Sequence, residues 1–324
     1  MLFWESLRGQ FAALPYPEQD CTGRVVIVTG SNTGLGLEAA RHFVRLNASK
    51  VILACRNVDK GEAAKKDIEE STRRHDVVQV WQLDLCSYES VKSFIQQADN
   101  SFERLDILVN NAGMTFDAWD YAENHEMTLT VNVISPLLLS LSLLPLLRAS
   151  GRKFNMTPRV VFVSSEGAFM TKFPERTAEN IFKALDTNHN LFERYNTAKL
   201  LQLIIVQKLA KACDSSAKEH VLINALAPGL CNTAFYQRSS STMANFLLRV
   251  LFWPFWRDAE IGSRTIMAAA FADEDTHGKW MSHCKLQGWP GLMVGGVGED
   301  MADRVWAELV VIMEGIQGGV TRNV

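Results

Sequence analysis

The sequence lacks the features that mark several classes of protein. Its six cysteines include no CxxC pair and are scattered through 324 residues, which argues against a zinc site and a secreted disulfide scaffold. The formal net charge of -3 provides no strong field for gathering nucleic acid. No internal repeat or low-complexity linker interrupts the chain. We therefore expect a reducing, cytoplasmic environment, a small-molecule partner and no nucleic acid.

Long uninterrupted hydrophobic runs are missing as well. Residues 133–147 are strongly apolar but fall short of the roughly 18 to 20 residues that a membrane-spanning helix needs, and they contain Pro136 and Pro145. A second apolar stretch, residues 246–256, is shorter still. We expect a buried helix from the first stretch and no transmembrane segment. The second stretch, with the apolar residues 2–4, leaves peripheral membrane contact open.

Short apolar runs alternate with longer amphipathic stretches through most of the chain. This pattern is typical of parallel strands joined by crossover helices, with the sheet buried on both faces. The expected strands are 24–29, 50–55, 77–83, 105–109, 159–164 and 221–225, and the expected helices are 35–47, 59–73, 87–102, 122–149, 193–213, 258–272 and 300–315. The sequence therefore predicts an α/β protein with a doubly wound parallel sheet, the Rossmann fold. We expect a single domain over residues 22–324, preceded by an N-terminal extension, residues 1–21.

A glycine-rich turn follows the first expected strand and leads directly into a helix. Glycine lets the backbone turn tightly and approach a pyrophosphate, while the N–H groups at a helix start attract anionic oxygens. Such a turn can also be purely structural, but the strand before it and the helix after it favour dinucleotide binding. The residues predicted to bind the dinucleotide here are Gly30, Ser31, Asn32, Thr33, Gly34, Leu35 and Gly36.

The end of the second expected strand distinguishes the two nicotinamide cofactors. The residue there faces the adenosine ribose, and an acidic side chain would bond the 2′-hydroxyl of NAD. This sequence has Arg56 instead, whose guanidinium can form a forked, charge-assisted bond with the 2′-phosphate of NADP. We therefore predict NADP(H) as the cofactor. The alternative is an arginine that is simply exposed on the surface.

Two further motifs follow at characteristic places in the chain. Asn110-Asn111-Ala112-Gly113 follows the fourth expected strand, and Tyr195 lies four residues before Lys199 on a later helix. With the glycine-rich turn, these motifs make residues 22–235 resemble the short-chain dehydrogenase/reductase family. The TGSNTGLG turn, the ACRN strand end and the LDL motif look most like its retinol-dehydrogenase-like and WW-domain-oxidoreductase-like branch.

The resemblance implies four catalytic residues. Tyr195 matches the general acid/base, and Lys199, on the same helix face, would lower the pKa of the Tyr195 phenol from about 10 by its charge. Ser165, rather than Ser164, matches the residue that bonds the reacting oxygen. Asn132 matches the asparagine that holds a water in the proton relay toward the lysine; its alternative is a helix-interior residue with a local bond.

The resemblance also implies further contacts with the cofactor. Asp84 matches the position that contacts adenine, although a strand-end turn former is an alternative for it and for Asn110. The residues expected at the cofactor in addition to the glycine-rich turn and Arg56 are Asp84, Leu85, Asn111, Ala112, Gly113, Tyr195, Lys199, Pro228, Gly229 and Thr233.

The implied reaction is NADP(H)-dependent interconversion of a carbonyl and an alcohol. Between Ser165 and Tyr195 lie 29 residues, a long insertion for this family. Its Phe169, Phe173, Phe182 and Leu185 suggest an apolar wall, and residues 234–257 take the place of the substrate loop. We therefore expect a bulky apolar substrate, such as a retinoid, a steroid, a fatty aldehyde or a polyketide-type ketone of secondary metabolism. Alternatively, these aromatic side chains simply pack on the domain.

Other functions and properties stay open beside this one. The chain could be a catalytically idle NADPH-binding scaffold, or use the same fold for dehydration, epimerisation or reduction of a carbon–carbon double bond. The seven histidines are isolated in the sequence, so we expect no metal. The resemblance implies a homodimer or homotetramer, built through residues 133–147 and 200–209.

Overall fold

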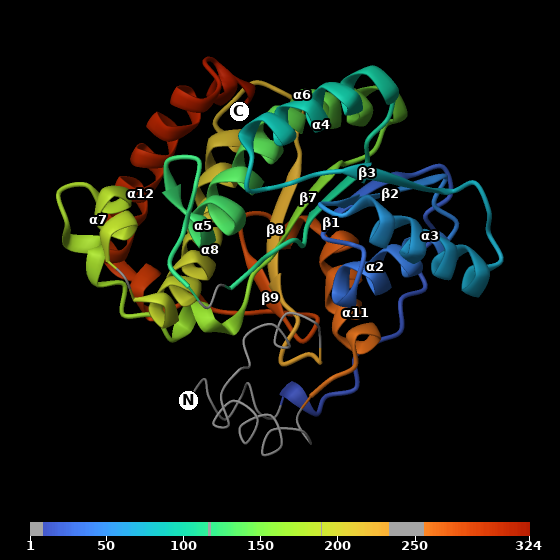
Figure 1. Ribbon diagram of the computed structural model, residues 1–324, viewed down its shortest axis with the longest axis horizontal. Coiled ribbons are helices and arrows are strands. Elements are labelled where there is room, and N and C mark those ends of the chain that lie inside the picture. Colours follow the sequence, from blue (N-terminus) through green and yellow to red (C-terminus); the bar gives the residue numbers. More distant parts are fainter. Residues whose placement is uncertain (1–8, 116–117, 189, 233–255) are drawn as a thin grey trace.

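A computed structural model describes residues 9–115, 118–188, 190–232 and 256–324 of the protein. Its middle layer is a sheet, and helices cover both faces of this sheet (Figure 1). The strands are β1 (Val25–Thr29), β2 (Lys50–Cys55), β3 (Val78–Gln82), β4 (Ile107–Asn110), β7 (Arg159–Val163), β8 (Leu222–Ala227), β9 (Trp280–Ser282) and β10 (Lys285–Leu286). They lie in the order β10-β9-β8-β7-β4-β1-β2-β3.

All neighbouring strands pair in parallel except β9 and β10, which are antiparallel. The chain winds outward from β1 through β2 and β3, and then in the other direction through β4, β7 and β8. The predicted doubly wound parallel sheet is therefore confirmed, with its switch point between β1 and β4. The short strand β9 and the edge strand β10 were not predicted, because three and two residues are too few to show an alternating pattern.

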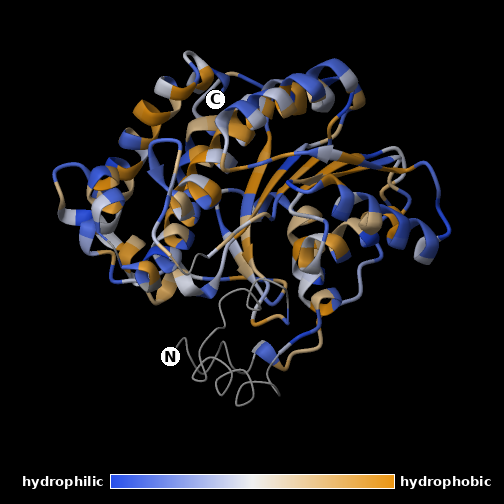
Figure 2. Cartoon of the chain, viewed as in Figure 1, coloured by the Kyte–Doolittle hydropathy of each residue, from blue (hydrophilic) through white to orange (hydrophobic). Residues whose placement is uncertain are grey.

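Two groups of helices bury the sheet. The helices are α2 (Gly34–Arg45), α3 (Val58–Thr72), α4 (Tyr88–Ser101), α6 (Ser135–Phe154), α7 (Ile181–Thr187), α8 (Leu191–Asp214), α11 (Ala259–Ala270) and α12 (Gly295–Ile316). Figure 1 shows α2, α3 and α11 on one face and α4, α6 and α8 on the other. The strands between them are mostly hydrophobic, whereas the outer helices alternate hydrophobic and hydrophilic residues (Figure 2). This is the burial on both faces that nearly continuous apolar strands predict.

The single helix expected over residues 122–149 is wrong at its N-terminal end. The chain first forms a hairpin of β5 (Tyr121–Ala122) and β6 (His125–Glu126), then a short turn α5 (Met127–Leu129) and a π turn η1 (Thr130–Ile134), and only then α6. Pro136 explains the π turn. It has no N–H for the carbonyl of Asn132 four residues earlier, so the α-helical hydrogen bond cannot form there.

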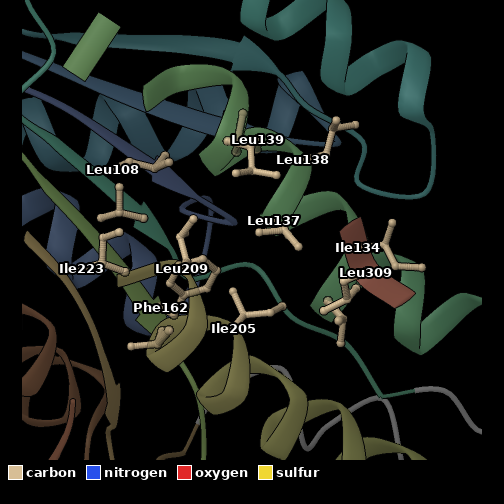
Figure 3. Close-up of a cluster of buried hydrophobic side chains, with 14 of the residues drawn as sticks. Leu108, Ile134, Leu137, Leu138, Leu139, Phe162, Ile205, Leu209, Ile223 and Leu309 are labelled. Carbon is tan, nitrogen blue, oxygen red and sulfur yellow. The ribbon is translucent and has the colours of Figure 1, made fainter. Parts of the chain in front are cut away.

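The helical segment Met127–Phe154 is long and apolar enough to cross a membrane, but 89% of its most apolar window is buried inside the chain. Its leucines pack on the sheet and on α8, as Leu137, Phe162 and Leu209 illustrate (Figure 3). The expected buried helix is therefore confirmed. The expected oligomer faces are not, because the apolar side chains of 133–147 and 200–209 are buried within the chain itself, except for the exposed Pro145 and the half-buried Leu146.

Part of the N-terminal extension is docked on the fold. The Tyr16 ring lies between the guanidinium groups of Arg45 and Arg264, 4.3 and 5.1 Å from its centroid. Arg264 also donates to the carbonyl of Leu14 with a distance of 2.9 Å. These contacts direct the extension along α2 and α11 toward the carboxyl edge of the sheet.

Candidate active site

A cavity of about 1500 Å³ opens at the carboxyl ends of the parallel strands, where doubly wound sheets bind ligands. It gathers most of the residues singled out from the sequence. Those that line it are Gly30, Asn32, Thr33, Gly34, Leu35, Arg56, Asp84, Leu85, Asn111, Ala112, Gly113, Ser165, Tyr195, Lys199, Pro228 and Gly229. Ser31, Gly36 and Asn132 lie behind this lining, and Thr233, with the apolar stretch 246–255, lies outside the described residues.

The glycine-rich turn is held tightly between β1 and the segment after β4. Gly30 has a φ of 65°, and a Cβ there would come within 2.9 Å of the Ala112 backbone. Both facts require glycine. The buried Ser31 hydroxyl donates to the carbonyl of Val28 at 2.7 Å and so stabilises the turn from behind. Among the residues that the structure describes, no side chain caps the first N–H groups of α2, which leaves them to an anionic ligand in the cavity.

The other end of the cavity carries positive charge. Arg56 is exposed there, and Lys60, in the first turn of α3, lines the same region. Sequence analysis missed Lys60, although its position four residues after Arg56 was available as a signal. Burial and the charge of Asp84 raise the pKa of the Cys86 thiol to about 11, and nearby Arg56 opposes this shift. Arg56 and Asp84 thus reach the same end of the cavity.

Asp84 also has a structural task. One of its carboxylate oxygens accepts the N–H of Cys86 at 3.0 Å, which fixes the turn after β3. Asn111 plays a similar part after β4, because its amide donates to the carbonyl of Thr29 at 2.8 Å. The turn-forming alternative for Asp84 therefore describes one of its contacts, while both residues also line the cavity.

Tyr195 and Lys199 meet at the centre of the site. The Nζ atom of Lys199 lies 5.7 Å from the centroid of the Tyr195 ring. The lysine is buried, and the loss of solvation lowers its pKa to about 7. Its Nζ donates to the carbonyl of Val163 at 2.9 Å and to Oε1 of Gln202 at 3.1 Å. The helix face shared by residues four apart therefore brings both functional groups to one place.

The two serines after β7 point in different directions. The Ser164 hydroxyl is buried and donates to the Lys199 carbonyl at 2.9 Å, which ties β7 to α8. The half-buried Ser165 hydroxyl accepts the N–H of Gly167 at 3.1 Å, so its own hydrogen can be donated into the cavity. This geometry favours Ser165 over Ser164 as the residue that bonds a reacting oxygen.

Asn132 supports the site from behind. Its side-chain amide accepts the N–H of Met114 at 2.9 Å and donates to the Met114 carbonyl at 2.7 Å. These bonds span 18 residues, so the alternative of a purely local bond is wrong. A Cβ on Gly113 would lie 2.9 Å from Oδ1 of Asn132 and 3.4 Å from Nζ of Lys199. Glycine is therefore needed where the segment after β4 passes the lysine.

The expected apolar wall is wrong for three of its four residues. Phe173, Phe182 and Leu185 are at most 2% exposed and pack in the core. Only Phe169 lines the cavity, with its ring 5.1 Å from that of Trp280. The alternative, that these side chains pack on the domain, holds for the other three.

Polar groups from distant segments complete this part of the wall. Glu166 and Ser282 both line it, and the serine hydroxyl donates to Oε1 of Glu166 at 2.7 Å. His283 lines it too, with its Nε2 3.4 Å from the same oxygen. The substrate side of the cavity is therefore mixed in polarity, with Phe169, Met170, Leu191 and Trp280 among its apolar members.

Sequence analysis also missed the contribution of the N-terminal extension. Gln10 lines the cavity, and its amide donates to the Leu230 carbonyl at 2.7 Å and accepts the Leu230 N–H at 3.0 Å. Arg257 donates to the carbonyl of Gln10 at 3.1 Å and to that of Pro228 at 3.3 Å. The extension and the turn at Pro228 are thus joined across 220 residues of sequence, a separation over which no local pattern could signal contact.

Two of the histidines that are isolated in sequence meet in space, away from the cavity. His220 and His277 have ring centroids 4.6 Å apart, and Asp214 lies 3.3 Å from Nε2 of His277. Nδ1 of His277 accepts the N–H of Ile223 at 3.2 Å, so the neutral ring carries its hydrogen on Nε2. That nitrogen makes no hydrogen bond among the described residues, and the ligand atoms of Asp214, His220 and His277 all lie within 4.8 Å of one another, close enough to hold a metal ion. The expectation of no metal therefore stays a prediction.

Comparison with known proteins bears directly on this geometry. A family model described as short chain dehydrogenase matches residues 24–176. The short chain dehydrogenase atnD of Emericella nidulans is 47% identical over 277 residues, covering 84% of this chain and 88% of the relative. The short chain dehydrogenase/reductase dmxR8 of Cryptosporiopsis sp. is 38% identical over 321 residues, 97% of each chain. The chain belongs to the short-chain dehydrogenase/reductase family. It is thus a member of a family of oxidoreductases, while its branch within the family stays a prediction.

Solved structures agree at the level of the fold. A short chain dehydrogenase from Salmonella enterica serovar Typhi superposes with a TM-score of 0.61 at 22% identity, covering 83% of this chain and 99% of that one. The NADPH-bound carbonyl reductase from chicken fatty liver gives a TM-score of 0.60 at 19% identity, covering 83% of this chain and all of the other. These likenesses support the Rossmann-type fold of the dehydrogenase.

Proposed function

We propose that this dehydrogenase uses NADP(H) to interconvert a carbonyl and an alcohol on a bulky, largely apolar small molecule. The observation that carries the proposal is the convergence of Ser165, Tyr195 and Lys199 on the cavity that also holds the glycine-rich turn. These groups can bond an oxygen, donate a proton to it and provide positive charge beside it.

The donors of the cavity fit a nicotinamide dinucleotide. The uncapped N–H groups at the start of α2 suit a pyrophosphate, and Gly30 and Gly113 leave room for close backbone approach. When bound, the nicotinamide supplies or accepts the hydride. The chain itself supplies the proton, from the phenol of Tyr195 in the direction of carbonyl reduction. Ser165 donates a hydrogen bond to the same oxygen as its negative charge develops.

Arg56 and Lys60 support NADP over NAD. Both lie at the end of the cavity beside Asp84, and neither pairs with a carboxylate among the described residues. Two positive side chains there suit a 2′-phosphate better than a free hydroxyl. The NADPH bound by the chicken carbonyl reductase is consistent with this assignment. We also assign cofactor contacts to five residues that line the same cavity, Asp84, Leu85, Asn111, Pro228 and Gly229.

The size of the cavity supports a large substrate. About 1500 Å³ exceeds the roughly 300 to 1,000 Å³ of ordinary ligand sites, which leaves space for a substrate beside a dinucleotide. A polyketide-type ketone of secondary metabolism is our leading class, since the relatives come from fungi and the wall is mixed in polarity. Retinoids, steroids and fatty aldehydes are the other classes to test.

We propose that the dehydrogenase is cytoplasmic and forms a homo-oligomer. The buried helix Met127–Phe154 supports a cytoplasmic enzyme without a transmembrane segment. A homodimer or homotetramer would have to use mainly surfaces other than residues 133–147 and 200–209, because most of those side chains are already covered.

A carbonyl panel tests the proposal. Purified protein is incubated with NADPH or NADH and with ketones and aldehydes of each class, and cofactor oxidation is followed while products are identified. Formation of the alcohol with NADPH supports the proposal. NADPH binding without turnover of any class would favour an idle scaffold, and reduction of a carbon–carbon double bond, dehydration or epimerisation would assign another reaction to the fold.

A further inference from the structure

Gln202 lies less than one helical turn after Lys199 on α8, on the side of the lysine away from the cavity. Its side chain is completely buried. Oε1 accepts a hydrogen bond from Nζ of Lys199 at 3.1 Å, and Nε2 donates to the backbone carbonyl of Asn132 at 2.7 Å. The amide therefore forms a direct link between the lysine ammonium and the π turn before α6.

The Asn132 carbonyl accepts this bond because of Pro136. In a regular helix the N–H four residues later would occupy the carbonyl, but proline has none. The π turn at Thr130–Ile134 leaves the carbonyl directed at α8, and a buried carbonyl without a donor would be costly. Gln202 supplies that donor.

We propose that Gln202 is a positioning residue that fixes the ammonium group of Lys199 by connecting it to the Asn132 carbonyl. In the family that this chain resembles, a water held at the asparagine occupies the corresponding place in a proton relay. An amide differs from water, since its N–H and its oxygen cannot exchange roles by rotation. The link orients the lysine and stabilises its charge, and it carries no proton toward Asn132. The inference rests on the proposed function, because it concerns the lysine assigned to that reaction.

The surroundings of Lys199 contain few other groups that could do this. β7 contributes the Val163 carbonyl, the segment after β4 contributes Gly113 with the Asn132 amide behind it, and α8 contributes the Tyr195 ring. Tyr195 is the titratable group among these contacts. Burial is the cause of the lowered pKa of Lys199, with no carboxylate contributing to it. Gln202 and Val163 are thus its hydrogen-bond acceptors among the described residues.

The sign of the expected effect follows from this arrangement. Removal of Oε1 of Gln202 takes one of two acceptors from the charged form of Lys199, so the pKa should fall further below its value of about 7. Turnover that needs the ammonium would then be lost at a lower pH. We expect the alkaline limb of kcat to move down by about one pH unit, with kcat lowered about fivefold at pH 7.

Three variants test the inference. Gln202→Leu removes both bonds, Gln202→Asn keeps the amide but shortens it so that a water can complete the link, and Gln207→Leu makes the same change at a half-buried position of α8. The readouts are the pH profile of kcat, the pH profile of the NADPH Kd by fluorescence, and Tm. We expect a shifted limb in Gln202→Leu, substantial recovery of kcat and limb in Gln202→Asn, and wild-type limbs in Gln207→Leu.

The outcomes separate this inference from the proposed function. The role of Gln202 alone would be overturned if the wild type is active and the folded Gln202→Leu variant shows an unshifted limb. It would also be overturned if kcat of that variant falls by the same factor at every pH. Absence of any wild-type turnover would overturn the proposed function, and the pH profile of NADPH binding would still decide the link. If Gln202→Leu fails to fold, Gln202→Met, which keeps the length of the side chain but lacks the amide, takes its place. A lowered limb in that variant supports the inference, and an unshifted limb with unchanged kcat overturns it.

Discussion

The two sides of the cavity are built in different ways. The nucleotide side comes from short motifs at the ends of β1, β2, β3 and β4, each of which continues directly from its strand. The substrate side brings together Gln10, Glu166, Trp280 and His283, from three distant parts of the chain. A motif read locally in sequence can therefore describe the first side, whereas the second exists only after the sheet has assembled. Each of the following experiments tests this difference.

The largest effect is expected at the point where the two sides meet. Tyr195→Phe removes the proposed proton donor, so kcat should fall by about 10² to 10⁴ while the Kd for NADPH stays unchanged. Tyr121→Phe, which removes an exposed hydroxyl that donates to the Asp186 carbonyl, is the matched control and should retain activity. Steady-state kinetics and fluorescence titration measure both. Ready reduction by Tyr195→Phe would contradict the role of the phenol.

Lys199→Met should lower kcat and, at neutral and lower pH, raise the stability of the fold. In the unfolded chain this lysine keeps its proton up to a pKa near 10.5, whereas in the folded protein it loses the proton near pH 7. The unfolded state thus binds more protons between these values, so the stability of the wild type should rise relative to the variant as pH increases from about 7 to about 10.

At pH 7 and below the burial penalty of Lys199 is largest, and there Lys199→Met should have the higher Tm, while kcat falls by about 10² or more. Thermal unfolding over a pH series and steady-state kinetics measure these effects. Lys208→Met, on the same helix but paired with Asp303 on α12, is a control that should retain activity. A Tm difference for Lys199→Met that does not change with pH would argue against this account.

Arg56→Ala tests the nucleotide side of the cavity, which is built from short motifs at the ends of strands. It should weaken NADPH binding by about 1.5 to 3 kcal/mol, the usual value of a hydrogen bond to a charged group, with little change for NADH. Lys60→Ala should act in the same direction, and Lys66→Ala, on the outer face of α3, should have little effect. Titration with both cofactors measures the effect. Equal loss of NADPH and NADH affinity would refute the contact with a 2′-phosphate.

The smallest effect is expected for a change in the N-terminal extension. Gln10→Ala removes two hydrogen bonds to Leu230 and should cost about 0.5 to 3 kcal/mol of stability, with a change of a few-fold in the KM for substrate. Gln19→Ala, farther along the same extension and exposed, is the control. Denaturant unfolding and kinetics provide the measurements. Equal stability and equal KM in the two variants would mean that the N-terminal extension contributes nothing to the site.

Local pattern and chain order explain which predictions succeeded. The six longer strands and the glycine-rich turn were predictable, because apolar runs and glycine report on backbone conformation and burial at their own positions. The insertion was misjudged, because Phe173, Phe182 and Leu185 look alike in sequence whether they face the cavity or the core. The helix over 122–149 was misjudged at its start, where residues 121–126 form a hairpin of two short strands and Pro136 removes one helical hydrogen-bond donor.

By itself the sequence determined the doubly wound sheet, the nucleotide turn and the pairing of Tyr195 with Lys199. Each of these depends on patterns among residues that are close together in the sequence. Only the tertiary structure decided that Gln202 bridges Lys199 and Asn132, and that Gln10 joins Leu230 across the mouth of the cavity. Those contacts depend on the relative placement of separate elements. That placement is set by packing of the whole core rather than by any local run of residues.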